Sequence, residues 1–200
     1  MSAAQKRLIS PQEYLERERR AEFKSEYIRG EVFAMSGATA RHTLIAANVL
    51  GELRQRLKGG PCRVYGSDLR VKAEKAGHYA YPDVVVVCGE PEFEDKYFDT
   101  LLNPKVIVEV LSPSTENYDR GEKFRSYRTL PSLQEYVLVS QDEPLVERYV
   151  RQSDVNWLLA PFAGITAELP FESLSVVVPF GEIYAGVTFP AERTNESNVT

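Results

Sequence analysis

The run Val84–Val87 is the feature that most restricts how this chain can fold. A strand at the surface of a sheet alternates apolar and polar residues, because successive side chains point to opposite faces. Four consecutive valines leave no polar face, so we expect a strand that is covered on both sides. The stretch 105–111, with the sequence KVIVEVL, is predicted as another strand, because it is rich in β-branched residues.

Helical periodicity is clearest over residues 40–58, where large apolar residues recur every three or four positions. Gly59-Gly60 follows and is expected to end this helix, since glycine readily adopts the left-handed conformation of helix C-termini. A shorter helix is predicted over residues 11–24, which are charged and carry few large apolar anchors. The segment EYIRGEVFAM alternates around Arg29-Gly30 and predicts a β-hairpin.

The order of the remaining elements predicts a mixed sheet. The strand 105–111 is followed by a helix that begins at Asp119 and ends before Pro131, and then by another strand. Such a strand–helix–strand crossover favours parallel pairing of its two strands. The earlier strands are joined by loops that permit antiparallel pairing. The strands expected in the sheet are 64–73, 81–87, 105–111 and 135–140, with a peripheral hairpin formed by 145–152 and 156–164.

The chain length fits one α/β domain, predicted over residues 1–190, followed by a polar tail at 191–200. No apolar run approaches the roughly 18 residues of a membrane span, and the N-terminus lacks the apolar core of a secretory signal. A cytoplasmic protein is therefore expected. The net charge of -5 argues against a broad basic surface that coats nucleic acid. It allows an enzyme that meets phosphate at one local site.

Cysteine and histidine usage limits the kinds of metal site. Cys62 and Cys88 do not form a CxxC pair, which excludes a zinc knuckle and gives no support for a disulfide. His42 and His78 are the two histidines, too few for a histidine-rich centre. Any metal must therefore be held by carboxylates, which favours Mg²⁺ or Mn²⁺.

Two acidic residues occur where a charge is costly. Asp83 stands at the start of the valine run, and Glu109 lies inside an apolar strand on the same face as Ile107 and Leu111. A buried carboxylate needs a cation, a metal ion or a proton, and two converging carboxylates also repel each other. One divalent ion resolves both problems. The alternative is that Glu109 pairs with an arginine or lysine of the neighbouring helix and nothing more.

Several motifs together resemble a known family. They are YPDVVVV, LLNPKVIVEVLSPST, YDRGEKFRSYRTLPSLQEYVLVS, and EYIRGEVFAMSGA followed by His42. In this order and spacing, over nearly the whole chain, they resemble the Uma-two type of restriction endonuclease within the PD-(D/E)XK nuclease superfamily. The resemblance implies a restriction endonuclease-like fold, in which helices flank a mixed β-sheet with peripheral β-hairpins.

The resemblance also implies roles for individual residues. Asp83 corresponds to the aspartate of the PD motif and Glu109 to its second acid, so both would bind the metal. The lysine that normally follows two residues later is absent, because Leu111 occupies that position. The resemblance implies that this lysine has moved to the following helix, where Lys123 is the candidate. Lys123 would lie in the first turn of a helix capped by Asp119, or else be a surface lysine that pairs with Asp119.

Four further polar residues are weaker candidates. Glu31 is considered as a third carboxylate, although a solvated hairpin residue is the simpler interpretation. Asp68 fits either an indirect role beside the site or a turn at the edge of a strand. His42 could approach the site from the long helix or form hydrogen bonds in the core. Tyr127, one turn after the candidate lysine, could fix that lysine or only pack against a neighbouring phenylalanine.

These residues favour Mg²⁺-dependent hydrolysis of DNA phosphodiester bonds. Asp83, Glu109 and the backbone carbonyl of Val110 would hold the ion, and Lys123 would position the attacking water. Because cutting both strands of a duplex needs two sites, a homodimer is expected. Two alternatives stay open. One is a catalytically silent DNA- or protein-binding module, which the missing strand lysine and the acidic charge favour; the other is a metal-dependent hydrolase of a small phosphorylated substrate.

Overall fold

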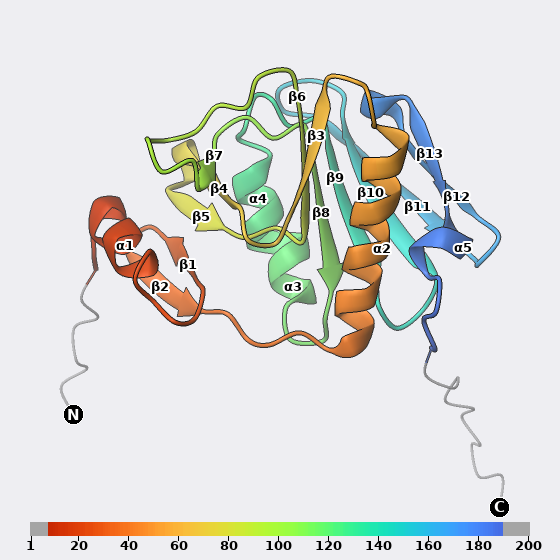
Figure 1. Ribbon diagram of the computed structural model, residues 1–200, viewed down its shortest axis with the longest axis horizontal. Coiled ribbons are helices and arrows are strands. Elements are labelled where there is room, and N and C mark those ends of the chain that lie inside the picture. The colour runs from red at the N-terminus through yellow and green to blue at the C-terminus, as the bar shows by residue number, and fades with distance from the viewer. Residues whose placement is uncertain (1–7, 190–200) are drawn as a thin grey trace, which may run out of the picture.

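A six-stranded mixed sheet forms the centre of the protein in the computed structural model, which describes residues 8–189. Helix α2 (Ala40–Arg56) lies along one face of this sheet, and the shorter helices that follow β8 lie on the other (Figure 1). The predicted α/β class, with helices on a mixed sheet, is confirmed. The strands in spatial order are β11 (Trp157–Ala163), β10 (Leu145–Arg151), β9 (Glu135–Ser140), β8 (Val106–Leu111), β6 (Val84–Cys88) and β3 (Cys62–Gly66).

The valine run has the two-sided burial that its sequence predicts. Val84 and Val86 pack with α2 in one apolar cluster, and the other two valines pack in a second cluster on the opposite face. All four side chains are fully buried. β8 pairs antiparallel with β6 and parallel with β9, in the register that places Glu109 opposite Leu138. The parallel pairing predicted from the crossover is therefore confirmed.

A second, five-stranded sheet packs against the face of the central sheet opposite α2 (Figure 1). Its hairpin turns at Arg29 and Gly30, whose φ angles are 48° and 98°, as the sequence predicts. β1 (Ser25–Ile28) of this hairpin pairs with β5 (His78–Ala80), which joins the N-terminal segment to this second sheet. The strands in spatial order are β2 (Glu31–Ala34), β1 (Ser25–Ile28), β5 (His78–Ala80), β4 (Arg70–Ala73) and β7 (Thr100–Leu101).

The prediction of one continuous strand over residues 64–73 is wrong. β3 belongs to the central sheet and β4 to the second sheet. The turn between them includes a hydrogen bond from the Leu69 amide to the Gly66 carbonyl at 3.3 Å. The sequence Gly66-Ser67-Asp68 consists of residue types that favour turns, and it ends the first strand. The chain can therefore change sheets at this point.

The first two helices begin where the sequence predicts. α1 (Pro11–Glu18) ends earlier than the predicted residue 24, because the backbone turns after it and enters β1. α2 begins after Thr39, whose hydroxyl accepts a hydrogen bond from the His42 amide at 3.1 Å. Gly59, with a φ of 81°, follows the end of α2, as expected for a glycine that stops a helix.

The helical segment after β8 differs from its prediction. It starts as α3 (Glu116–Tyr118), continues as the π-helical turn η2 (Asp119–Lys123) and ends as α4 (Phe124–Tyr127). Asp119 therefore lies inside the segment and does not cap it. A π-helical turn is rare and is frequently found at functional sites, so η2 is a candidate part of the functional site.

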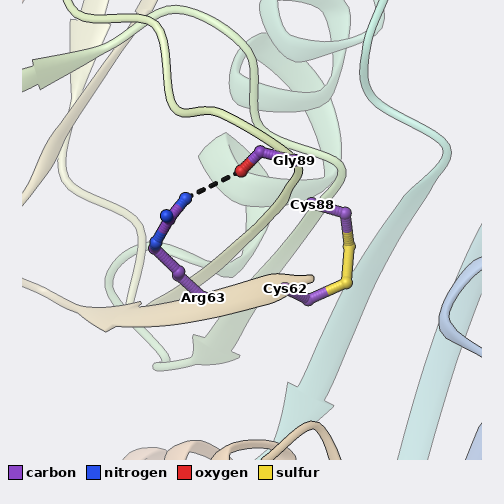
Figure 2. Close-up of a disulfide and its surroundings, with 4 residues drawn as sticks. All are labelled: Cys62, Arg63, Cys88 and Gly89. Atoms are coloured by element: carbon purple, nitrogen blue, oxygen red, sulfur yellow. Dashed lines mark hydrogen bonds between the residues drawn. A yellow bond between two sulfur atoms is a disulfide. The ribbon is translucent and has the colours of Figure 1, made fainter. Parts of the chain in front are cut away.

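Cys62 and Cys88 form a disulfide, contrary to the expectation from sequence (Figure 2). β3 and β6 pair antiparallel and place the two cysteines directly opposite each other. The CxxC criterion could not find this pair, because the cysteines are 26 residues apart and meet only through strand pairing. Beside them, the Arg63 guanidinium donates a hydrogen bond to the Gly89 carbonyl at 2.8 Å, which further joins the ends of the two strands.

The later hairpin is not peripheral, because β10 pairs with β9 as well as with β11 and so belongs to the central sheet. Among the described residues, no helix is long and apolar enough to cross a membrane. The tail expected at 191–200 lies outside those residues, and a single domain over 1–190 stays a prediction. The remaining elements are η1 (Glu74–Ala76), β12 (Glu168–Phe171), η3 (Glu172–Leu174), β13 (Val176–Pro179) and α5 (Phe180–Ile183).

Candidate active site

Asp83 is held at the end of the sheet where β6 begins. Its Oδ2 accepts a hydrogen bond from the Val110 amide of β8 at 2.7 Å. His42 Nε2, from the first turn of α2, lies 3.3 Å from the same oxygen. Both side chains are 15% exposed, so solvent can reach this pair. Of the two outcomes that the sequence left open for His42, the structure shows the approach to Asp83.

Glu109 is more deeply buried, near the carboxyl end of β8. Its side chain is 3% exposed and lies on the face of the sheet that also carries Ile107 and Leu111. The Tyr127 hydroxyl donates a hydrogen bond to Glu109 Oε1 at 3.2 Å. Lys123 Nζ lies 3.2 Å from the same oxygen. The cation beside this acid therefore comes from the helical segment that follows the strand.

Lys123 is surrounded by carboxylates. One oxygen of each of three acids lies 3.2–3.3 Å from its ammonium: Glu26, Glu109 and Asp119. The lysine side chain is 7% exposed and none of the three acids exceeds 8%. The alternative of a surface lysine is wrong, since the pair with Asp119 exists but is buried and shared with two other acids. We call these four residues the Lys123 cluster.

The π-helical turn η2 positions two members of the Lys123 cluster. Asp119 and Lys123 are its first and last residues. The Tyr136 hydroxyl of β9 donates a hydrogen bond to the Asp119 carbonyl at 2.9 Å, which holds the turn against the central sheet. Because a π-helical turn is wider than an α-helical one, it changes the directions in which its side chains point.

Burial and unbalanced charge govern the electrostatics of the site. Burial raises the pKa of Glu109 well above its ordinary value, Lys123 opposes this increase, and nearby carboxylates, Asp83 among them, add to it. Burial alone would lower the pKa of Lys123, but the surrounding carboxylates raise it, so the ammonium stays charged. At His42, burial is outweighed by the hydrogen bond and the charge of Asp83, and the pKa of the imidazole is raised.

Asp83 and Glu109 each have a basic partner of their own, His42 for the first and Lys123 for the second. Their charges still interact, since Asp83 is among the groups that raise the pKa of Glu109. Within residues 8–189, no group of three or more histidine, cysteine or acidic residues is arranged as a ready metal site. Metal binding by Asp83 and Glu109 therefore stays a prediction.

Comparison with known proteins adds an independent observation. Residues 11–180 match the Uma2 family, whose description is "Putative restriction endonuclease". The chain belongs to this family. It is similar to the uncharacterized protein sll1609 of Synechocystis sp., with 37% identity over 176 residues that cover 88% of this chain and 99% of that protein. The uncharacterized protein slr1290 of the same organism is 36% identical over 181 residues, which cover 90% of this chain and 94% of that protein.

A solved structure shows the same fold. The crystal structure of a "putative nuclease belonging to DUF820" from Anabaena variabilis matches with a TM-score of 0.72 and 20% sequence identity. The match covers 88% of this chain and 97% of that chain. The similarity therefore extends over nearly all of both proteins and supports the restriction endonuclease-like architecture of this Uma2 chain.

Glu26 is the site residue of this Uma2 chain that sequence reasoning missed. Of the two acids in the hairpin, Glu26 contacts Lys123, whereas Glu31 was the acid considered from sequence as a third carboxylate, with a solvated hairpin residue as the simpler interpretation. Glu26 is 6% exposed, and its Oε2 accepts a hydrogen bond from the Tyr118 hydroxyl at 2.7 Å. No local pattern distinguishes the two acids, because Glu26 becomes buried only when β1 pairs with β5 and the helical segment after β8 covers it.

Two of the weaker candidates are placed clearly. The Asp68 side chain is 93% exposed and pairs with Lys24 at 2.5 Å, so it is a turn residue rather than a partner of the site. Tyr127 does more than pack against a phenylalanine, since its hydroxyl contacts Glu109. In this Uma2 chain, Tyr127 therefore holds Glu109, the acid beside Lys123, whereas the sequence suggested that it could fix Lys123 itself.

Proposed function

We propose that this Uma2 protein is a metal-dependent endonuclease that hydrolyses phosphodiester bonds in DNA, with Mg²⁺ or Mn²⁺ as its cofactor. The observation that most supports this function is the position of Lys123 Nζ, buried 3.2 Å from Glu109 Oε1. A positioned ammonium can orient an attacking water and offset the negative charge that develops in the transition state. In this proposal Lys123 of η2 replaces the lysine that is absent from β8, where Leu111 stands.

The donor chemistry of the site suits a divalent cation. Asp83 and the acids of the Lys123 cluster provide four carboxylates, against two basic groups, Lys123 and His42. Oxygen donors with excess negative charge are the ligands that Mg²⁺ and Mn²⁺ prefer. We propose that Asp83, Glu109 and the Val110 carbonyl hold the ion. When bound, it would supply Lewis acidity toward a phosphate oxygen and a more acidic water.

The residues of the chain then divide the remaining tasks. Lys123 orients the attacking water and balances charge at the phosphate. Tyr127 limits the movement of Glu109 through its hydrogen bond. The first turn of α2, which carries His42, brings the positive end of a 17-residue helix beside Asp83. A phosphate that approaches this accessible edge is attracted by that end of the helix.

The low exposure of the site favours a second candidate function, the hydrolysis of a small phosphorylated substrate. Glu109 and Lys123 are 3% and 7% exposed, and the more accessible Asp83 and His42 only 15%. A small substrate could reach such a site with less movement of the protein than a duplex. The two candidate functions use the same residues. They differ in the size of the substrate that reaches the site past Asp83 and His42.

We also propose a homodimer, because two sites are needed to cut both strands of a duplex. β2 supports this proposal, since it is an edge strand that pairs only with β1 among the described strands. Val32 and Met35, on and just after β2, are 44% and 36% exposed. Multi-angle light scattering should give twice the mass of the chain, and a monomer mass at high protein concentration would contradict the proposal.

The test of the function is incubation of the protein with supercoiled plasmid, single-stranded DNA and bis(p-nitrophenyl) phosphate. Each substrate is offered with Mg²⁺, with Mn²⁺ and with EDTA. We expect metal-dependent cleavage of DNA, which Asp83→Ala reduces by roughly 10²–10³-fold, as expected for loss of transition-state stabilisation. The matched control is Asp68→Ala, which removes an exposed aspartate outside the site and should cleave like the wild type.

Three outcomes would contradict the endonuclease proposal. They are the absence of DNA cleavage, equal cleavage in EDTA, and equal cleavage by Asp83→Ala. Hydrolysis of the small phosphodiester without cleavage of either DNA would support the second candidate instead. A comparison of melting temperatures shows whether the Asp83 variant remains folded, which we expect because the substitution removes a charge from a group of mutually repelling acids.

A further inference from the structure

His78 is a buried histidine to which the proposed reaction gives no role. It opens β5, is 1% exposed, and pairs with Ile28 of β1. Residues two positions apart on a strand share a face, and paired residues on adjacent strands point the same way. This register therefore places His78 on the same face of the second sheet as Glu26, a member of the Lys123 cluster.

The Tyr118 hydroxyl connects the two side chains. It donates a hydrogen bond to Glu26 Oε2 at 2.7 Å and lies 3.0 Å from His78 Nε2. A tyrosine hydroxyl has one hydrogen, and it is given to the carboxylate, so the contact with the imidazole requires a proton on Nε2. Burial lowers the pKa of His78 to about 4, so the ring is neutral near pH 7. The hydrogen bonds therefore run in one direction, from His78 through Tyr118 to Glu26.

The same imidazole lies against a second tyrosine of the site. The rings of His78 and Tyr127 are nearly parallel, with an angle of 3° and a centroid distance of 6.1 Å. Tyr127 donates its hydroxyl to Glu109, the other glutamate beside Lys123. His78 thus contacts both tyrosines that hold the glutamates of the Lys123 cluster, one through a hydrogen bond and one through ring packing.

We infer that His78 is a positioning residue, which through Tyr118 fixes the Glu26 carboxylate and so holds the Lys123 ammonium toward Glu109. This inference rests on the proposed function, because the position of Lys123 matters for hydrolysis only if Lys123 acts there. Without the Nε2 proton, the Tyr118 hydroxyl loses the donor that fixes its orientation. Glu26 would then be free to draw Lys123 away from Glu109, since it is one of the three acids that share the ammonium.

The inference predicts a specific pattern among variants in steady-state cleavage of plasmid DNA. His78→Phe keeps an aromatic ring but removes the donor, and should lower kcat by about 10–100-fold, as loss of a group that orients an active-site ligand does. His78→Gln restores an N–H donor and should recover most of this loss. KM should change little in either variant, because His78 is buried and does not reach the substrate.

Tyr118→Phe provides the matched comparison. If His78 acts through the Tyr118 hydroxyl, the double variant His78→Phe/Tyr118→Phe should cleave no more slowly than Tyr118→Phe alone. Independent, multiplying effects would mean that His78 contributes only to packing, and would overturn the inference. Wild-type kcat in His78→Phe would overturn it as well.

A measurement without DNA separates this inference from the proposed function. In ¹⁵N–¹H correlation spectra, His78 should be neutral and protonated at Nε2, and Tyr118→Phe should shift that signal. A proton on Nδ1, or a signal that ignores Tyr118→Phe, would overturn the inference whatever the activity. If the expected signal is found but the wild type cleaves no DNA, the proposed function fails while the hydrogen-bonded chain to Glu26 is supported.

Discussion

The Lys123 cluster and the ionic cluster around Asp99 differ in the balance of their charges. In the Asp99 cluster two arginines meet two aspartates: Arg19 contacts Asp95 and Asp99 at 2.7 and 2.8 Å, and Arg70 contacts Asp99 at 2.7 Å. The Asp99 side chain is 30% exposed. In the Lys123 cluster one lysine meets three acids, and all four side chains are almost fully buried.

This difference in balance changes the state of the carboxylates. Burial would raise the pKa of Asp99, but the hydrogen bonds from Arg19 and Arg70 lower it well below its ordinary value. The pKa of Glu109 is instead raised, because burial and other carboxylates outweigh Lys123. In a cluster with equal numbers of acids and bases, such as the Asp99 cluster, the charges compensate one another, and no metal ion is needed to neutralise them. A buried excess of acid destabilises the folded protein, and we propose that it is retained because these acids bind a metal ion.

Replacing one cation of each cluster, Lys123 in one and Arg70 in the other, should give the largest effects. Lys123→Met leaves three buried acids without their cation, and should lower the free energy of unfolding by about 3–5 kcal/mol. Arg70→Met should cost less, about 1–3 kcal/mol, because Asp99 is partly exposed and keeps Arg19. Cleavage by the folded fraction should fall by roughly 10² or more in the Lys123 variant and stay unchanged in the Arg70 variant. Urea unfolding measures the free energy of unfolding, and single-turnover experiments measure the rate of cleavage. Equal losses of cleavage in the two variants would contradict a catalytic role that is specific to the Lys123 cluster.

The pH dependence of stability should differ in sign between the clusters. The pKa of Glu109 is raised in the folded protein, so above about pH 4.5 the folded protein binds more protons than the unfolded chain. The contribution of Glu109 to the free energy of unfolding therefore declines as pH rises. The lowered pKa of Asp99 gives a contribution that is present above about pH 3.8 and is lost as pH falls. The free energy of unfolding of Glu109→Gln, relative to the wild type, should therefore increase as pH rises. That of Asp99→Asn should be lower than the wild type at neutral pH and should approach the wild-type value as pH falls. Urea titrations at several pH values test this, and slopes of the same sign would contradict it.

Tyr127→Phe is a milder change to the Lys123 cluster. It removes the hydrogen bond to Glu109 but leaves the ion pair with Lys123. We expect a loss of about 1–2 kcal/mol in the free energy of unfolding and about tenfold in kcat. A variant with unchanged kcat would show that Glu109 does not need this tyrosine to keep its orientation.

Asp68→Ala should have the smallest effect. Its carboxylate is 93% exposed and pairs with Lys24 on the surface. Exposed ion pairs contribute little to stability, so the free energy of unfolding should change by less than about 0.5 kcal/mol. A larger change, or any loss of cleavage, would mean that Asp68 interacts with the site and is not a valid control.

The fold was predictable from sequence wherever the residue pattern of a single segment indicates which of its side chains are buried or where the chain turns. The valine run, the crossover from β8 to β9 and the turn at Arg29-Gly30 all follow from local patterns. The division of residues 64–73 between two sheets and the disulfide of Cys62 with Cys88 could not be read, because both depend on which strands pair. Local turn residues signalled the division only in part.

The candidate site shows the same limit. Asp83 and Glu109 could be named as candidates because they stand at motif positions, and Lys123 because it lies in the segment after the strand that lacks the motif lysine. The structure brings Lys123 to Glu109. Glu26 could not be named, since an acid in a short hairpin strand has no local sign of burial. The π-helical turn that begins at Asp119 and ends at Lys123 was predicted as an ordinary capped helix. The reason is that the D-x-x-E pattern of this segment also matches a helix N-cap.

The central claim is that the excess of buried acid exists to hold a divalent ion, and direct titration with Mn²⁺ tests it. Calorimetry in the absence of DNA should show one site per chain in the wild type and in Asp68→Ala. Binding should be lost in Asp83→Ala and strongly weakened in Glu109→Gln, while Asp99→Asn should bind like the wild type. A wild-type protein that binds no Mn²⁺, or an Asp83→Ala variant that binds it equally well, would contradict the claim.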